Sequence, residues 1–136
     1  MSTVQYETLR DARAHMTDIT NRAASGRPVA YARDHHVIAA VDADRLRDAL
    51  AALHPARAEV FTEGRAVGIA ISELGLAVEG DTFEDAVAEM TIALRDYADD
   101  WADHLRLAGN HAKHWGVVQI IAYSSDEQLA EWVKGA

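Results

Sequence analysis

The stretch that determines the fold runs from Tyr6 to Asp42 and reads YETLRDARAHMTDITNRAASGRPVAYARDHHVIAAVD. Thr8 can cap a helix, with Asp11 as its partner three residues later. Apolar side chains then recur at alternating spacings of three and four, and they are Leu9, Ala12, Met16, Ile19 and Ala23. This period predicts one helix of about eighteen residues with a narrow apolar seam. Gly26 and Pro28 are expected to end the helix.

The narrow seam also bears on assembly, because it suits packing against a sheet or against the same helix of a second chain. On so short a module, Leu9, Met16 and Ile19 cannot all be buried within one chain. We therefore expect these three residues to form the interface of a homodimer.

A hairpin and a second helix follow. Val29 to Arg33 and His36 to Asp42 have strand composition and are separated by Asp34-His35. A two-residue turn usually needs positive φ from Gly or Asn, so His35 predicts either a longer loop or a strained one. Asp42 or Asp44 then caps a helix with the apolar face Leu46, Ala49, Leu50 and Leu53, which His54-Pro55 ends.

The second half begins with strands. Glu59 to Thr62 and Ala66 to Ser72 predict another hairpin, and Leu76 to Glu79 predicts a third short strand. Gly80-Asp81-Thr82 then leads into the longest helix, capped by Asp81 with Glu84 or by Thr82 with Asp85. Its apolar stripe comprises Phe83, Val87, Met90, Leu94, Tyr97, Trp101 and Leu105, and we expect the helix to stop at Gly109-Asn110.

The end of the chain contains one continuous apolar run, Val117 to Tyr123, which predicts a central strand. Ser124 or Ser125 can cap a last helix with Leu129, Trp132 and Val133 on one face. The chain is therefore expected to be α+β, with a helix, a hairpin and a second helix in a module over residues 1–55 and a β-β-β-α-β-α domain over residues 57–136.

Three segments of the first module carry a family resemblance: Thr8-Leu9-Arg10-Asp11-Ala12-Arg13, Ser25-Gly26-Arg27-Pro28-Val29, and the hairpin from Ala32 to Ala39. In this order they resemble the antitoxins of the Phd/YefM ("prevent-host-death") family. Those proteins begin with a short strand, so the resemblance implies the order β-α-β-β-α over residues 1–55. His35 and His36 stand where that family usually has Gly and Arg or Pro. The resemblance implies a dimeric antitoxin that binds its operator, represses its operon and occludes a toxin, usually an endoribonuclease. The alternative is a protein-interaction module of antitoxin ancestry that no longer binds DNA.

A second, shorter resemblance covers Ala70 to Ala86, where a strand leads through Gly80-Asp81-Thr82 into a helix. This segment is similar to HicB-type antitoxins, in which a G-D-T helix entry recurs, although the prolines of their preceding turn are absent. The resemblance implies a small HicB-like domain in the second half.

The charge is divided unevenly along the 136 residues, whose formal net charge is −9. Met1 to Arg57 contains eight Arg and seven acids, whereas Ala58 to Ala136 contains five Lys or Arg and fifteen acids. This division favours a phosphate backbone as partner for the first half and a basic protein for the second. The alternative is that the charges serve only solubility. The candidate toxin-binding residues form an acidic helix flank: Asp96, Asp99, Asp100 and Asp103.

The candidate DNA-binding residues are Thr8, Arg10 and Arg13 at the first helix entry and Arg33 and His36 in the hairpin. Helix N-termini favour phosphate, and arginine is the commonest side chain for bidentate contact with guanine. The alternative for Arg10 and Arg13 is a solvated arginine paired with Glu7 or Asp11.

Several functions find no support in the sequence. His104, His111 and His114 lack the i, i+4 pairing of a helical metal site, so we expect no metal and no cofactor. Nucleophile motifs, Gly-rich phosphate loops and paired catalytic acids are absent, so we expect no enzyme. With 49% hydrophobic residues, no Cys, no membrane-length apolar run and no leader-like start, we expect a folded cytoplasmic protein without disulfides.

Overall fold

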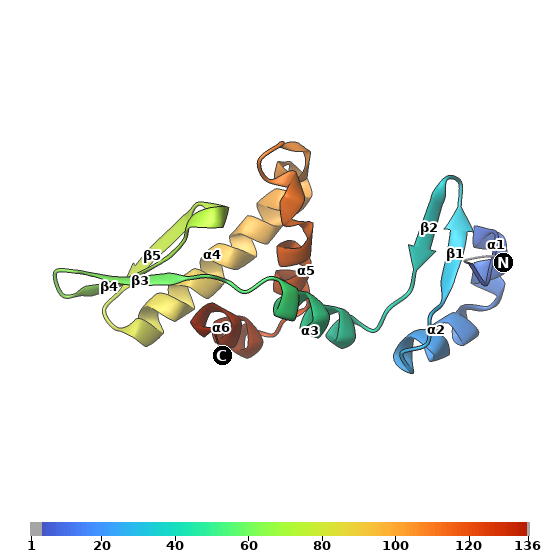
Figure 1. Cartoon of the computed structure of the whole chain (residues 1–136), viewed down its shortest axis with the longest axis horizontal. Coiled ribbons are helices and arrows are strands. Elements are labelled where there is room, and N and C mark those ends of the chain that lie inside the picture. Colours follow the sequence, from blue (N-terminus) through green and yellow to red (C-terminus); the bar gives the residue numbers. More distant parts are fainter. Residues whose placement is uncertain (1–3, 136) are drawn as a thin grey trace. The chain divides into compact units, whose positions relative to one another are not determined.

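The computed structural model describes residues 4–135, which form two compact units divided between Leu46 and Arg47 (Figure 1). The division between the units falls inside α3 (Ala43–Leu53). The boundary expected from the sequence, near Pro55, lies just beyond the other end of the same helix. Both units contain helices and a small antiparallel sheet, so the α+β class is confirmed.

The first unit begins with two short helices, α1 (Leu9–Ala14) and α2 (Met16–Ala24). Thr8 caps α1 as predicted, since its hydroxyl accepts the Asp11 N–H at 3.0 Å. The prediction of one continuous helix is wrong. At His15, Nδ1 lies 2.8 Å from the Asp11 carbonyl oxygen, so the imidazole takes the acceptor that the His15 backbone N–H would use in a continuous helix. The seam is consequently divided between two helix axes.

The hairpin of this unit consists of β1 (Ala30–Arg33) and β2 (His36–Ala39), which pair antiparallel with Arg33 opposite His36. The turn has two residues rather than a longer loop, and Asp34, not His35, has the positive φ, of 53°. Asp42 caps α3, because its Oδ1 accepts the Arg45 N–H at 3.0 Å. The first strand of the expected β-α-β-β-α order is reduced to a single parallel bridge between Tyr6 and Tyr31.

The core of the first unit is very small. Its buried apolar residues are Ala12, Ile19 and Val29, and Tyr6, Ala23, Tyr31 and Ala40 pack partly buried against them. Beside this core the Tyr6 hydroxyl donates to the Asp18 carboxylate, which Arg22 Nε also contacts at 3.2 Å. The hydrogen bond from Tyr6, followed by that from Arg22, lowers the pKa of Asp18 below its ordinary value.

The second unit is organised around one helix, α4 (Phe83–Asp103). This helix packs against β4 (Ala66–Ile71) and β5 (Leu76–Gly80) on one side, and it also packs against α5 (Trp115–Tyr123) and α6 (Asp126–Lys134) (Figure 1). The sheet has the order β3-β4-β5, with β3 (Glu59–Glu63) at one edge. The buried core contains Met90, Leu94, Ile120, Ile121 and Leu129, each 0% exposed. Three 3-10 turns connect the elements: η1 (Ser72–Leu74), η2 (Leu105–Leu107) and η3 (Ala112–His114).

Two predictions for the second unit are wrong. The long helix ends at Asp103 rather than at Gly109, and the run Val117 to Tyr123 lies in helix α5 instead of a central strand. The observed order is therefore three strands followed by three helices, not β-β-β-α-β-α. Arg95 stabilises the C-terminus of α5, because its guanidinium donates to the carbonyl oxygens of Ile121 and Ser124. A helix end needs such donors, because its last carbonyl groups lack intrahelical partners.

Candidate functional site

The candidate DNA-binding residues all lie at the surface of the first unit. Arg10 and Arg13 project from α1, while Arg33 and His36 face each other across the end of the hairpin. The hydroxyl of Thr8 is occupied by the cap of α1. Because α1 is only six residues long, its N-terminus offers a weak dipole, so any attraction for phosphate depends mainly on the arginine side chains.

Three arginines of this surface, Arg10, Arg13 and Arg33, are uncommitted, which means that their guanidinium groups have no acidic partner among residues 4–135. Within this described range, the side chains of Arg10, Arg13 and Arg33 make no hydrogen bond or ion pair. The expected alternative, pairing of Arg10 or Arg13 with Glu7 or Asp11, is therefore not seen. Arg22 differs, because its ion pair with Asp18 holds it within the fold. The uncommitted arginines keep their full charge available for an anionic partner.

The candidate dimerisation residues have different exposures. Ile19 is 3% exposed and belongs to the core of its own unit, whereas Met16 is 49% exposed and Leu9 is half-buried. Three further apolar residues are exposed on and after β2, namely Val37, Ile38 and Val41. Sequence patterning missed them, because a strand with both faces exposed has the same composition as one whose apolar face is buried. Together with Met16 they are the large apolar residues that the described part of the first unit leaves exposed.

The candidate toxin-binding residues Asp96, Asp99, Asp100 and Asp103 are all exposed along α4. One of them, Asp99, contributes to the lining of a groove of about 420 Å³ between α4 and α5. The remaining lining is largely apolar and includes Ala98, Ala102, Val118 and Ala122. The exposed aspartates of α4 suit a partner with basic side chains.

The histidines are divided between the interior and the surface of the second unit. Tyr97 joins two of them, since its hydroxyl lies 2.8 Å from His111 Nδ1 and 2.7 Å from His114 Nδ1. Burial, and then the charge of Glu73, raises the pKa of Tyr97. The protonated phenol can donate to only one imidazole, so the other must donate its Nδ1–H to the phenol oxygen. His104 stays outside this network, 3.1 Å from Asp103.

His114 is the unusual member of the network. It is 2% exposed, and its Nε2 lacks a hydrogen-bond partner within the described residues, the nearest carboxylate oxygen of Glu73 being 3.8 Å away. Burial lowers the pKa of His114, which outweighs the opposing effect of Glu73, and His111 and Lys113 lower it further. His114 is consequently neutral in the folded protein at pH 7.

This lowered pKa predicts a pH dependence of stability. The unfolded chain, with an ordinary histidine pKa, binds a proton more tightly than the folded one, so stability is lost as the pH falls below about 6.5. We expect His114→Asn, whose amide can replace Nδ1, to lose less stability than the wild type between pH 7 and pH 5. Urea unfolding at several pH values measures this. The control is His104→Asn, which makes the same substitution at an exposed histidine. Parallel curves for the wild type and His114→Asn would contradict the prediction.

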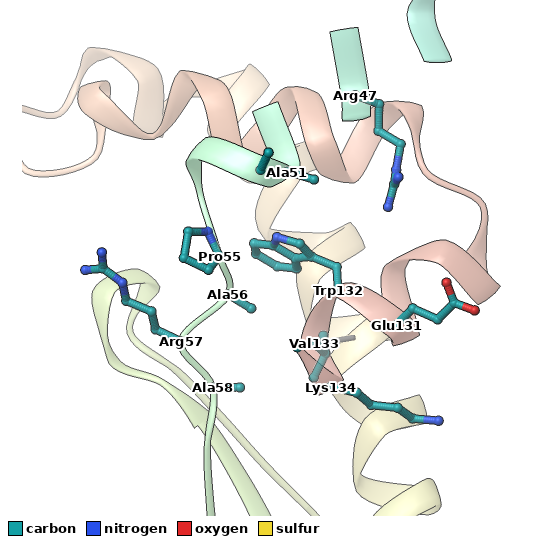
Figure 2. A pocket seen from close by; sticks show the side chains of 12 residues that line it. Arg47, Ala51, Pro55, Ala56, Arg57, Ala58, Glu131, Trp132, Val133 and Lys134 are labelled. Atoms are coloured by element: carbon teal, nitrogen blue, oxygen red, sulfur yellow. The ribbon is translucent and has the colours of Figure 1, made fainter. Parts of the chain in front are cut away.

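A groove that the sequence did not indicate lies between the end of α3 and α6 and has a volume of about 550 Å³. Figure 2 shows the indole of Trp132 facing Pro55 across it. Trp132 Nε1 donates to the His54 carbonyl oxygen at 2.8 Å, and Arg47 Nε donates to Ser124 Oγ at 2.7 Å. Because these bonds connect α3 to the two last helices, we assign the residues that make them a structural role.

Two kinds of site are not found among residues 4–135. No helix in this range is long and apolar enough to cross a membrane. The same part of the chain brings together no group of three or more His, Asp or Glu side chains that could hold a metal ion.

The fold and its charged surfaces define a small two-unit α+β protein, and comparison with known proteins places it in a family. A family model described as "Antitoxin of toxin-antitoxin, RelE / RelB, TA system" matches residues 1–134. The chain therefore belongs to this antitoxin family, and a toxin is its partner in such a system. No match was found among curated proteins.

A solved structure has the same fold. It comes from Syntrophomonas wolfei subsp. wolfei and is described as the antitoxin part of a toxin/antitoxin system. It has a TM-score of 0.79 and 18% sequence identity, and the similarity covers 95% of this chain and 96% of that one. At this identity the likeness establishes the fold alone.

Proposed function

We propose that this antitoxin is a homodimer of the Phd/YefM kind, whose first unit binds operator DNA and whose second, HicB-like unit binds the toxin. The observation that most supports this proposal is the unequal charge of the two units. The first contains six arginines and six acids, and the second contains seven Lys or Arg and sixteen acids. A DNA-binding surface is therefore compatible with the first unit, whereas the acidic second unit favours a basic protein such as a ribonuclease.

The small core supports the dimer. A unit with three buried apolar residues and a two-stranded sheet buries too little surface to be stable by itself. Burying Met16, Val37 and Ile38 against a second copy would enlarge that core.

We expect Met16→Asp combined with Ile38→Asp to convert a dimer into a monomer, since two buried carboxylates without partners oppose association. The dissociation constant should rise roughly a hundredfold or more. Sedimentation at tens of micromolar measures this, with Leu107→Asp, a change at an exposed residue of the second unit, as control. A monomeric wild type at that concentration would refute the dimer.

DNA binding rests on the uncommitted Arg10, Arg13 and Arg33, which two chains would present as six cations. The proposed antitoxin role is tested by co-expressing the protein with the toxin encoded by the neighbouring gene and measuring the recovery of growth. Autorepression is tested by titrating the full chain onto the promoter DNA of its operon and onto scrambled DNA. Equal affinity for both DNAs would remove the repressor role and leave toxin binding intact.

The short α1 favours the alternative function, an antitoxin that only binds protein. Six helical residues give little attraction for phosphate, and His35 and His36 occupy the hairpin turn region in place of Gly and Arg or Pro. Under this alternative the full chain neutralises the toxin, and it binds the promoter DNA of its operon no more tightly than scrambled DNA.

A further inference from the structure

Strand β3 (Glu59–Glu63) is an open sheet edge. All five of its residues are exposed, including Val60 at 56% and Phe61 at 38%. The strand pairs with β4 on one side, and among the described residues no strand pairs with its other side. The opposite edge strand, β5, is packed closely against α4. Exposed edges promote aggregation, and proteins protect them by covering them, shortening them or placing charges on them. No strand covers the open side of β3 among the described residues, and its protection consists of the charges of Glu59 and Glu63.

The side chains of β3 alternate between two faces. Glu59, Phe61 and Glu63 lie on the face away from α4, where the Phe61 ring covers Gly68 of β4 so closely that a Cβ built on Gly68 would lie 2.2 Å from it. Glu79 of β5, opposite Gly68, adds a third carboxyl to the same face. A hydrogen bond with Glu63, and then the charge of Glu63, raises the pKa of Glu79. The face is therefore acidic around one aromatic ring.

This pattern discriminates between two occupants of the edge. If two copies paired antiparallel about Phe61, each Glu59 would lie opposite Glu63 of the other copy, and like charges directly opposite each other are destabilising. A strand with Lys or Arg at alternate positions would instead place a cation opposite each glutamate. Its intervening residues would face Val60 and Thr62, which favours apolar side chains there.

We propose that β3 accepts a strand of the toxin in which basic and apolar residues alternate, so that the sheet of the second unit extends into the partner. This inference rests on the proposed toxin contact of the second unit and specifies that the contact is made by strand pairing at β3. The main-chain bonds of β3 provide affinity, and Glu59 and Glu63 select for a basic strand.

The test measures amide hydrogen exchange of the full chain with and without the toxin encoded by the neighbouring gene, and toxin affinity in charge-reversed variants. We expect exchange to slow at residues 59–63 on binding. Glu59→Lys combined with Glu63→Lys should weaken binding roughly tenfold or more, since two attractions become repulsions. The control is Glu89→Lys combined with Glu131→Lys, which makes the same charge change at exposed helix positions and should alter affinity less than about twofold.

A synthetic peptide that alternates lysine and valine provides a second readout, because it should slow exchange at β3 whereas a glutamate–valine peptide should not. Equal effects of both peptides, unchanged exchange at residues 59–63 in the toxin complex, or self-association that requires β3 would each overturn the proposal. If growth is still rescued while β3 exchange is unchanged, the proposed antitoxin function stands and only this inference fails. If the toxin does not bind at all, both fail.

Discussion

Gly80→Ala is expected to destabilise the second unit by about 3 kcal/mol, because an added methyl group there has no space. A Cβ built on Gly80 lies 2.4 Å from the backbone nitrogen of Ala86 and 2.7 Å from the carbonyl carbon of Asp85. Both atoms belong to the first turns of α4, whose Thr82 cap holds the Asp85 N–H at 3.1 Å. Backbone cannot rotate away as a side chain can, so β5 and α4 would have to separate.

Urea unfolding of the full chain measures this effect, with Gly109→Ala as the control. A Cβ on Gly109 meets no heavy atom within 4 Å, and Gly109 is not among the positive-φ residues, so its replacement should change stability by less than about 0.5 kcal/mol. Equal stabilities of the two variants would show that the strand and the helix are less closely packed than the structure indicates. In the Gly-Asp-Thr sequence the glycine permits the close approach of β5 to α4, and the threonine caps the helix.

We expect promoter binding to weaken by roughly a hundredfold at 0.1 M salt when alanine replaces Arg10, Arg13 and Arg33 together. Six arginines of a dimer would neutralise phosphates or contact guanine edges, so the wild type should show a log–log salt slope of order −3 to −5. The triple variant should show a slope close to zero.

The matched control replaces Arg57, Arg65 and Arg106, three exposed arginines of the second unit, and removes the same charge. A similar loss of affinity in both triple variants would mean that binding follows net charge alone and that the first unit has no DNA surface. Single variants then separate two roles, because base contacts at Arg10 or Arg13 would relax sequence preference by about 1–3 kcal/mol, whereas a phosphate contact at Arg33 would weaken all sequences alike.

Local signals in the sequence determined most of the elements. Thr8 caps its helix as predicted, and each of the other three caps is one of the two alternatives that the sequence offered, namely Asp42, Thr82 and Ser125. The hairpins and the strand Leu76–Gly80 lie within a residue or two of their predicted positions, apart from β2, which ends at Ala39. A cap or a tight turn involves residues only a few positions apart, so its energy is present in the local sequence.

The sequence predicted less of the candidate site than of the helices and strands. Exposure of Arg10, Arg13 and the α4 aspartates followed from their positions relative to the apolar stripes. The burial of Ile19 in its own unit and the open edge of β3 did not, because both depend on which other elements cover them.

Only the tertiary structure decided the elements whose competing conformations have similar local preferences. The break at His15 depends on its imidazole, which bonds to the Asp11 carbonyl and stacks on Tyr6 with ring centroids 4.9 Å apart. The run Val117 to Tyr123 has strand composition, yet it is helical because it is buried against α4 and Arg95 binds its terminal carbonyls. A short apolar run satisfies either conformation by itself, so packing and the distant arginine, 26 residues from Ile121, select the helix.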